Sequence, residues 1–247
     1  MSTFLPLVIA WTIIALVTFP FLLRVRVPYG RHARVGWGPQ VDNHWGWFWM
    51  ELPALLIFPM MTLLGPRPKD LLSWMLVGLW TLHYVNRTLI FPFRLRTRGK
   101  KMPLLIVGSA VLFNATNGVI NGWWLGFAAP PDRAFPDALV ILGGALFLIG
   151  MGINLRADAR LIALRRHGEG YQVPHGGLFE RISCPNHFGE ILEWSGFAIA
   201  AWSLPALSFA VWTFCNLAPR AHDHHAWYRR TFPDYPRSRK AVVPFIW

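Results

Sequence analysis

Apolar runs alternate with short polar connections along most of the chain. A transmembrane helix needs about 20 mostly apolar residues, and residues 4–23 supply such a run without one charged side chain. Six further runs follow, and only Ser203 separates the last two. The pattern predicts an all-α, polytopic membrane bundle of seven transmembrane helices, over residues 4–23, 45–64, 71–93, 103–129, 138–155, 188–202 and 204–217.

The basic residues are distributed unevenly over the connections between these runs. The connections after the first, third and fifth runs, and the tail after residue 217, each carry at least four Lys or Arg, whereas the connection after the second run carries two. Cytoplasmic loops hold the excess of Lys and Arg in membrane proteins. The alternation therefore predicts an N-terminus outside and a C-terminus in the cytosol, in a bacterial inner membrane or the endoplasmic reticulum.

Composition agrees with a membrane protein and narrows the possible partners. Of 247 residues, 54% are hydrophobic and 15% are charged, which is unlike a soluble domain. The net charge of +12 is compatible with nucleic acid, anionic lipid or a phosphate-bearing ligand. Because the basic residues follow membrane topology and no recognition motif is present, nucleic acid is not expected as a partner. The sequence contains no internal repeat, so residues 1–247 are expected to form one membrane domain. We expect this domain to be in contact with lipid and to be a monomer.

Few ionisable residues lie within the apolar runs, and each one is a candidate site residue because such residues are costly in lipid. Glu51 lies in the second run, and a protonated carboxyl group there could donate a hydrogen bond, although pairing with a basic residue for packing is the alternative. In the third run, His83, Tyr84 and Arg87 lie close together. Tyr84 could place its phenol beside an apolar cavity or could be one of the tyrosines common at membrane interfaces.

Three asparagines repeat at near-helical spacing in the fourth run, at Asn114, Asn117 and Asn121, together with Gly118 and Gly122. A polar stripe of this kind either holds helices together or lines a ligand site. The spacing leaves both interpretations open.

From residue 150 onward the chain becomes rich in groups that bind phosphates and amides. Arginines such as Arg165 suit phosphate oxygens, and glycines such as Gly176 and Gly177 allow backbone N–H groups to approach them. The glycines Gly150 and Gly152 lie in an apolar helical run rather than after a strand, so a Rossmann site is not supported. A nucleotide would have to bind between helices.

Metal binding is not expected. His224, His225 and Asp223 lie together, but no second ligand cluster of suitable spacing accompanies them. Cys184 and Cys215 have no metal-type spacing and are interpreted as structural.

Taken together, these motifs resemble the steroid 5α-reductase family along nearly the full chain. Residues 50–53, Met-Glu-Leu-Pro, resemble its acidic motif, and residues 83–87, His-Tyr-Val-Asn-Arg, resemble its His-Tyr-x-x-Arg motif. Residues 98–100, Arg-Gly-Lys, resemble a basic loop near the family's cofactor, and residues 234–245 resemble its C-terminal ending. Two positions depart from the family pattern: Met50 stands where Gln commonly precedes the acid, and His187 where an aromatic or apolar residue commonly follows the Asn.

The resemblance implies NADPH-dependent reduction of the 4,5 double bond of a 3-oxo-4-ene steroid. It implies that Glu51 and Tyr84 polarise the 3-oxo group, that residues 1–102 form the substrate side, and that residues 103–247 mainly bind cofactor. The residues that the resemblance assigns to NADPH are Asn117, Asn154, Asp158, Arg165, Tyr171, Asn186, Glu190, Arg220, His224 and Tyr228.

Three other functions fit parts of the same pattern. A related membrane reductase of a polyprenol or an enoyl thioester would share the C-terminal half, although the motifs at Glu51 and Tyr84 argue against it. A membrane methyltransferase would use S-adenosylmethionine in place of NADPH. A non-catalytic lipid binder would need a cavity but not the many cofactor-type residues.

Overall fold

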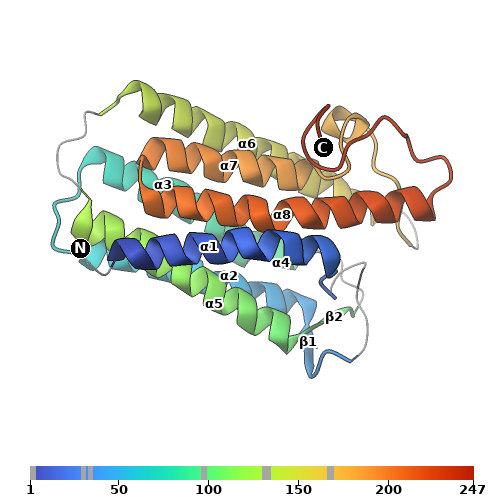
Figure 1. Cartoon of the computed structure of the whole chain (residues 1–247), viewed down its shortest axis with the longest axis horizontal. Coiled ribbons are helices and arrows are strands. Elements are labelled where there is room, and N and C mark those ends of the chain that lie inside the picture. The colour runs from blue at the N-terminus through green and yellow to red at the C-terminus, as the bar shows by residue number, and fades with distance from the viewer. Residues whose placement is uncertain (1–3, 29–31, 33–35, 96–98, 130–134, 166–169) are drawn as a thin grey trace.

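The computed structural model of the chain describes residues 4–28, 32, 36–95, 99–129, 135–165 and 170–247, and its architecture is helical (Figure 1). Two short strands, β1 (Gln40–Asp42) and β2 (Lys101–Pro103), pair antiparallel, with Val41 opposite Met102. The helices are α1 (Phe4–Arg24), α2 (Asn43–Leu64), α3 (Leu71–Val85), η2 (Asn86–Ile90), α4 (Phe91–Arg94), α5 (Leu104–Trp123), η3 (Trp124–Ala128), α6 (Ala138–Leu164), η4 (Gly177–Glu180), α7 (Pro185–Ala201) and α8 (Leu204–Thr231).

The all-α prediction is confirmed, and a helix lies on each of the seven apolar runs. Within the described residues, four helical segments are long and apolar enough to cross a membrane, namely α1, α2, α5 with η3, and α6. Of the remaining long helices, α3 has 15 residues and α7 has 17, which is short for a complete span, and the second half of α8 is rich in charged and polar residues. The count of seven spans and the orientation of the termini therefore stay predictions.

Several helices extend beyond the apolar runs that predicted them. Helix α6 continues to Leu164, α8 continues to Thr231, and α7 begins at Pro185. Hydropathy reports which part of a helix suits lipid, whereas backbone hydrogen bonding continues into polar sequence. The extensions contain half of the ten residues expected to bind cofactor, namely Asp158, Asn186, Arg220, His224 and Tyr228.

The long helices lie side by side along one axis (Figure 1). Helix α1 packs on α8, α2 on α5, and α6 on α7. The two strands and the C-terminus lie at one end of the bundle, and the N-terminal end of α1 lies at the other (Figure 1). Four helices begin with a side-chain cap, from Asp42, Asp70, Asp137 and Ser203 respectively.

Glycines allow α6 and α7 to touch backbone to backbone. A Cβ atom on Gly150 would lie 2.4 Å from the backbone nitrogen of Glu193, and a Cβ on Gly196 would lie 2.5 Å from the carbonyl oxygen of Gly143. Small residues permit this close approach between helices. The contact fixes the register of α6 against α7, and with it the positions of the polar side chains on both helices.

Candidate active site

Glu51 and Tyr84 meet at the side chain of Asn114, a residue of α5. The Tyr84 hydroxyl donates to Asn114 Oδ1 at 3.4 Å. Asn114 Nδ2 donates to Glu51 Oε2 at 3.1 Å and to the carbonyl oxygen of Met50 at 2.7 Å. One buried amide thus connects α2, α3 and α5 and brings the two predicted catalytic side chains to its opposite ends.

Aromatic rings surround Tyr84 and exclude water from it. Tyr84 is 3% exposed, and the centroid of its ring lies 5.1 Å from that of Trp80 and 5.8 Å from that of Trp194. Glu51 is only half-buried. Hydrogen-bond donors in such an apolar environment interact more strongly with a developing negative charge than they would in water.

Arg87 joins the part of the chain that carries Glu51 and Tyr84 to the C-terminal half. It lies on the π-helical turn η2, and its guanidinium contacts Asp158 Oδ2 at 3.3 Å and Glu190 Oε2 at 3.8 Å. The guanidinium also lies 5.0 Å from the ring centroid of Trp47. π-Helical turns are rare and often occur at functional sites.

Four of the residues expected to bind cofactor form one hydrogen-bonded cluster between α6 and α7. Asn154 Nδ2 donates to the carbonyl oxygen of Asn186 at 3.0 Å and to Glu190 Oε2 at 3.3 Å. Asn186 Nδ2 donates to Asp158 Oδ1 at 3.2 Å. The structure therefore brings Asn154, Asp158, Asn186 and Glu190 together around the guanidinium of Arg87.

Sequence reasoning did not identify the buried pair of His83 and Glu193. His83 Nδ1 lies 2.8 Å from Glu193 Oε1, and both side chains are almost fully enclosed. Glu193 lies three residues after Glu190 in α7, a spacing that places both on one helix face. The spacing of Glu190 and Glu193, together with the position of His83 next to Tyr84, was the sequence feature that could have predicted this pair.

Other predicted cofactor residues lie on the extended ends of α6 and α8. Arg165 follows the last residue of α6, and Arg220, His224 and Tyr228 recur at intervals of four on α8, so the three share one face. His224 Nδ1 lies 3.1 Å from His32 Nε2. The buried ring of Tyr228 stacks on another aromatic ring, that of Tyr235, at 5.2 Å.

The loop residue Tyr171 contacts the neighbouring basic loop. Lys100 Nζ donates to the Tyr171 hydroxyl at 3.0 Å and lies 4.7 Å from the centroid of its ring. The ring of Trp227, on α8, also contacts the ring of Tyr171, with 5.2 Å between the two centroids. Arg98, which belongs to the same predicted basic loop, lies outside the described residues.

Asn117 is used differently from the other predicted cofactor residues. Its Oδ1 accepts a hydrogen bond from Trp11 Nε1 at 3.1 Å, and its Nδ2 donates to the carbonyl oxygen of Phe113 at 2.8 Å. These contacts fasten α1 to α5. Its assignment to NADPH stays a prediction, and the packing interpretation of the asparagine stripe applies to this position.

A polar cluster around Ser183 fastens the C-terminal tail to the end of the bundle. Ser183 Oγ donates to the carbonyl oxygen of Lys240 at 3.1 Å and lies 2.6 Å from His225 Nδ1 and 2.7 Å from the Tyr235 hydroxyl. Burial raises the pKa of Tyr235, although the hydrogen bond between Tyr235 and Ser183 works in the opposite direction. Burial, and then the positive charge of Arg229, lowers the pKa of His225.

Arg239 is a second residue that the sequence did not single out. It is 1% exposed, and its guanidinium donates to the carbonyl oxygen of Pro174 at 2.9 Å and to Glu180 Oε2 at 3.3 Å. It therefore holds the loop before η4 against the tail. A charged residue in a polar tail normally indicates a solvated surface, so its burial could not be read from sequence.

The described residues contain no group of three or more His, Cys, Asp or Glu side chains that could hold a metal ion. Cys184 and Cys215 are buried thiols.

Comparison with known proteins adds three findings. A family described as 3-oxo-5-alpha-steroid 4-dehydrogenase matches residues 100–247. The chain is 39% identical to a steroid 5-alpha-reductase of Gossypium hirsutum over 95% of its length and 94% of the relative's. It is 41% identical to 3-oxo-5-alpha-steroid 4-dehydrogenase 1 of Bos taurus (94% of this chain, 93% of the relative) and 43% identical to 3-oxo-5-alpha-steroid 4-dehydrogenase 2 of Homo sapiens (81% and 79%).

Proposed function

Because this chain belongs to the 3-oxo-5-alpha-steroid 4-dehydrogenase family and is an oxidoreductase, we propose that it reduces the 4,5 double bond of 3-oxo-4-ene steroids with NADPH. The observation that carries this proposal is the pair of Glu51 and Tyr84, which are joined through Asn114, with Tyr84 enclosed by aromatic rings. The names of the relatives supply the substrate class.

In the proposed reaction, the protonated carboxyl group of Glu51 and the hydroxyl group of Tyr84 donate hydrogen bonds to the steroid 3-oxo oxygen. The single hydroxyl proton of Tyr84 turns from Asn114 Oδ1 to this oxygen when the steroid binds. NADPH, when bound, supplies the hydride. As the hydride adds to C5, the electron pair of the 4,5 double bond moves toward C3 and its oxygen, where the two donors stabilise the enolate. A proton from water then adds to C4 and the 3-oxo group is restored. Each donor of this kind is worth about 3 to 4 kcal/mol of transition-state stabilisation in a dry site.

Asn114 is a positioning residue in this mechanism. Its Nδ2 donates to Glu51 and its Oδ1 accepts from Tyr84, so one amide sets the orientation of both side chains. Its third bond, to the carbonyl oxygen of Met50, holds the amide itself in place.

The residues of the C-terminal half fit a nicotinamide dinucleotide by the chemistry of their donors and acceptors. Arg165 and Arg220 are only partly buried and suit phosphate oxygens. The amide and carboxylate groups of Asn154, Asn186 and Glu190 suit the hydroxyl and amide groups of a nucleotide. We assign these residues to NADPH binding, next to the side chains proposed to bind the steroid.

The test is NADPH oxidation by the purified, detergent-solubilised protein, with and without progesterone, together with identification of the product. Steroid-dependent oxidation that yields the 5α-dihydro steroid is expected. Glu51→Leu and Tyr84→Phe should each lower kcat by at least about 100-fold, the cost of one lost donor, with little change in NADPH affinity. The control is Asp234→Asn, an exposed carboxyl group in the tail.

The outcomes separate the competing functions. NADPH binding without steroid turnover would keep the reductase and change the substrate to a polyprenol or an enoyl thioester. Binding of S-adenosylmethionine but not NADPH would replace the proposal with a methyltransferase. Full activity of Glu51→Leu would remove Glu51 from the mechanism.

A further inference from the structure

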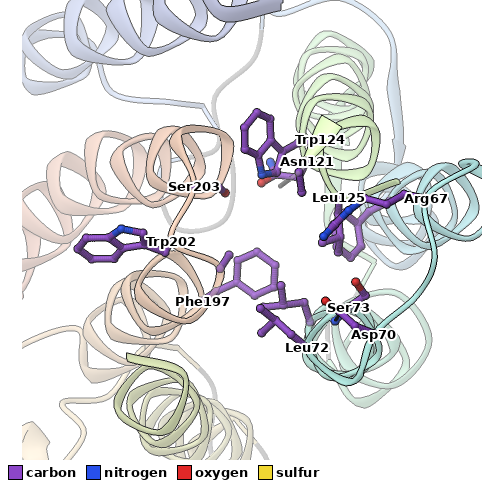
Figure 2. A pocket seen from close by; sticks show the side chains of 14 residues that line it. Arg67, Asp70, Leu72, Ser73, Asn121, Trp124, Leu125, Phe197, Trp202 and Ser203 are labelled. Atoms are coloured by element: carbon purple, nitrogen blue, oxygen red, sulfur yellow. Dashed lines mark hydrogen bonds between the residues drawn. The ribbon is translucent and has the colours of Figure 1, made fainter. Parts of the chain in front are cut away.

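A cavity of about 330 Å³ opens at the end of the bundle where α3 and α8 begin (Figure 2). Side chains from α2, α3, α5, η3 and α7, and from the α2–α3 and α7–α8 connections, contribute to its lining. Binding sites for small molecules generally have volumes of about 300 to 1,000 Å³. The cavity is therefore large enough for one compact ligand.

The lining combines an apolar interior with a few polar groups. Leu72, Trp124 and Leu125 contribute apolar surface, and Arg67 and Asp70 add charge (Figure 2). This composition is typical of sites that hold an apolar ligand by its body and orient it by one polar substituent.

Ser73 lies on the polar side of the cavity, next to Asp70. The residue is 1% exposed, and its hydroxyl group interacts with the carboxylate of Asp70. Buried hydroxyl groups normally have a partner of this kind. The charged side chains of the lining, Arg67 and Asp70, have more exposed surface.

The wall of the cavity is fixed by backbone contact between α2 and η3. A Cβ atom on Gly65 would lie 2.2 Å from the carbonyl oxygen of Gly126, and the same oxygen accepts a hydrogen bond from the backbone N–H of Arg67 at 3.1 Å. Trp124 and Leu125 face the cavity from the π-helical turn η3. Rigid walls favour a ligand of defined shape over a flexible chain.

The cavity adjoins the proposed active site but is separated from it by aromatic rings. The ring of Phe58 stacks on that of Trp80 at 4.3 Å, and Trp80 lies 5.1 Å from Tyr84. Asn121, which lines the cavity, follows Asn114 by seven residues on α5, a rise of about 10 Å along the helix. The two sites therefore lie one behind the other along the bundle.

We infer that this cavity is a second steroid-binding position, an antechamber that holds a 3-oxo-4-ene steroid apart from Glu51 and Tyr84. The rigid ring system packs against Leu72, Trp124 and Leu125, and a polar substituent reaches Arg67. The identity of the ligand rests on the proposed function. The geometry of the cavity does not depend on it.

Cysteine protection tests the inference directly. Ala201 lines the cavity and is partly exposed, so Ala201→Cys introduces a thiol there, whereas Cys184 and Cys215 are buried. At a progesterone concentration of ten times its Kd, maleimide modification of the introduced thiol should slow by about 11-fold, the factor 1 + [L]/Kd. Leu71→Cys, at the same end but outside the lining and 64% exposed, should not be protected.

The measurement is made in the wild-type background and with Glu51→Leu, so that binding in the cavity is separated from turnover. Protection in both backgrounds supports the inference, and it does so even if the protein turns over no steroid, in which case the proposed function alone fails. Steroid turnover without protection of the Ala201→Cys thiol overturns the inference and leaves the proposed function intact. Equal protection by palmitate overturns it as well, since the cavity would then be a general lipid site.

A kinetic variant gives a second readout. Leu72→Trp places a larger side chain in the cavity lining, and Leu71→Trp makes the same change on the exposed neighbour. Leu72→Trp should raise KM for progesterone several-fold without changing NADPH affinity, and Leu71→Trp should change neither. Unchanged KM in a folded Leu72→Trp protein contradicts the antechamber.

Discussion

Replacing Arg87 with Met should destabilise the protein more than any surface substitution. The Arg87 side chain is 11% exposed, and its guanidinium pairs with Asp158 at 3.3 Å and with Glu190 at 3.8 Å. Met preserves much of the apolar stem but removes the guanidinium, which also lies over the rings of Trp47 and Phe91. Two enclosed carboxylates would then lack their common cation.

Breaking a buried ion pair by removing one partner costs about 3 to 5 kcal/mol. For a chain of this size, each kcal/mol shifts the thermal midpoint by roughly 2 to 4 °C, so Arg87→Met should unfold roughly 6 to 20 °C below the wild type. Differential scanning fluorimetry of the purified protein in detergent measures this shift. Adding Asp158→Asn should recover part of the loss, because one of the two orphaned carboxylates is then removed.

The matched control is Arg26→Met. Arg26 pairs with Asp223 at the same distance of 3.3 Å, but its side chain is 46% exposed. Exposed ion pairs contribute about 0 to 1 kcal/mol, which corresponds to a shift of at most about 4 °C. If both arginine variants lost the same few degrees, burial would not be what makes Arg87 important, and the reasoning would be refuted.

Three further predictions follow from particular contacts. Gly150→Ala should separate α6 from α7 and lower both the thermal midpoint and NADPH affinity, whereas Gly152→Ala, where a Cβ meets open space, should raise the midpoint slightly; equal effects in unfolding scans would contradict the backbone contact. Asn114→Leu should lower kcat for steroid reduction more than about tenfold by releasing Glu51, with NADPH affinity unchanged, and wild-type kcat would argue against a positioning role. The pKa of His225 is lowered, so the folded state binds fewer protons than the unfolded state near pH 6.5. The thermal midpoint should therefore decrease when the pH is lowered from about 7.5 to about 5.5, and the decrease should be smaller in His225→Gln.

The sequence predicted elements better than it predicted contacts between them. Apolar runs located every long helix, and the polar residues within those runs identified Glu51, Tyr84 and Arg87 as candidates. It could not show that Asn114 connects Glu51 with Tyr84, because the bonds join positions 63 and 30 residues apart and depend on how three helices are rotated. Hydropathy likewise could not predict where a helix ends when its last turns consist of polar residues.

The sequence also could not show the roles of polar residues that depend on their neighbours in the fold. Asn114 and Asn117 occupy the same stripe and look alike in sequence, yet one contacts the predicted catalytic pair and the other fastens α1 through Trp11. Arg239 lies in a basic tail but is enclosed by the loop that it holds. Each outcome depends on the neighbour that the fold supplies, not on the residue type.

The helices that carry the C-terminal candidate residues depart most from a simple transmembrane pattern. Helix α7 carries Glu190 and Glu193, but these carboxylates face Arg87 and His83 inside the bundle rather than lipid. Such internal pairing offsets the cost of placing charge within a membrane. The seven-span prediction and the proposed position of the cofactor residues therefore depend on each other.

Topology mapping tests that dependence. If α7 crosses the membrane, its last residue, Ala201, lies on the face opposite the C-terminus, as the ends of the bundle are arranged in Figure 1. In sealed, oriented vesicles, an impermeant maleimide should reach the thiol of Ala201→Cys only from the outer side and that of Asp234→Cys only from the cytosolic side. Labelling of both thiols from the same side would mean that residues 201 and 234 lie on one side of the membrane. This result would overturn the seven-span count together with the orientation inferred from the basic loops.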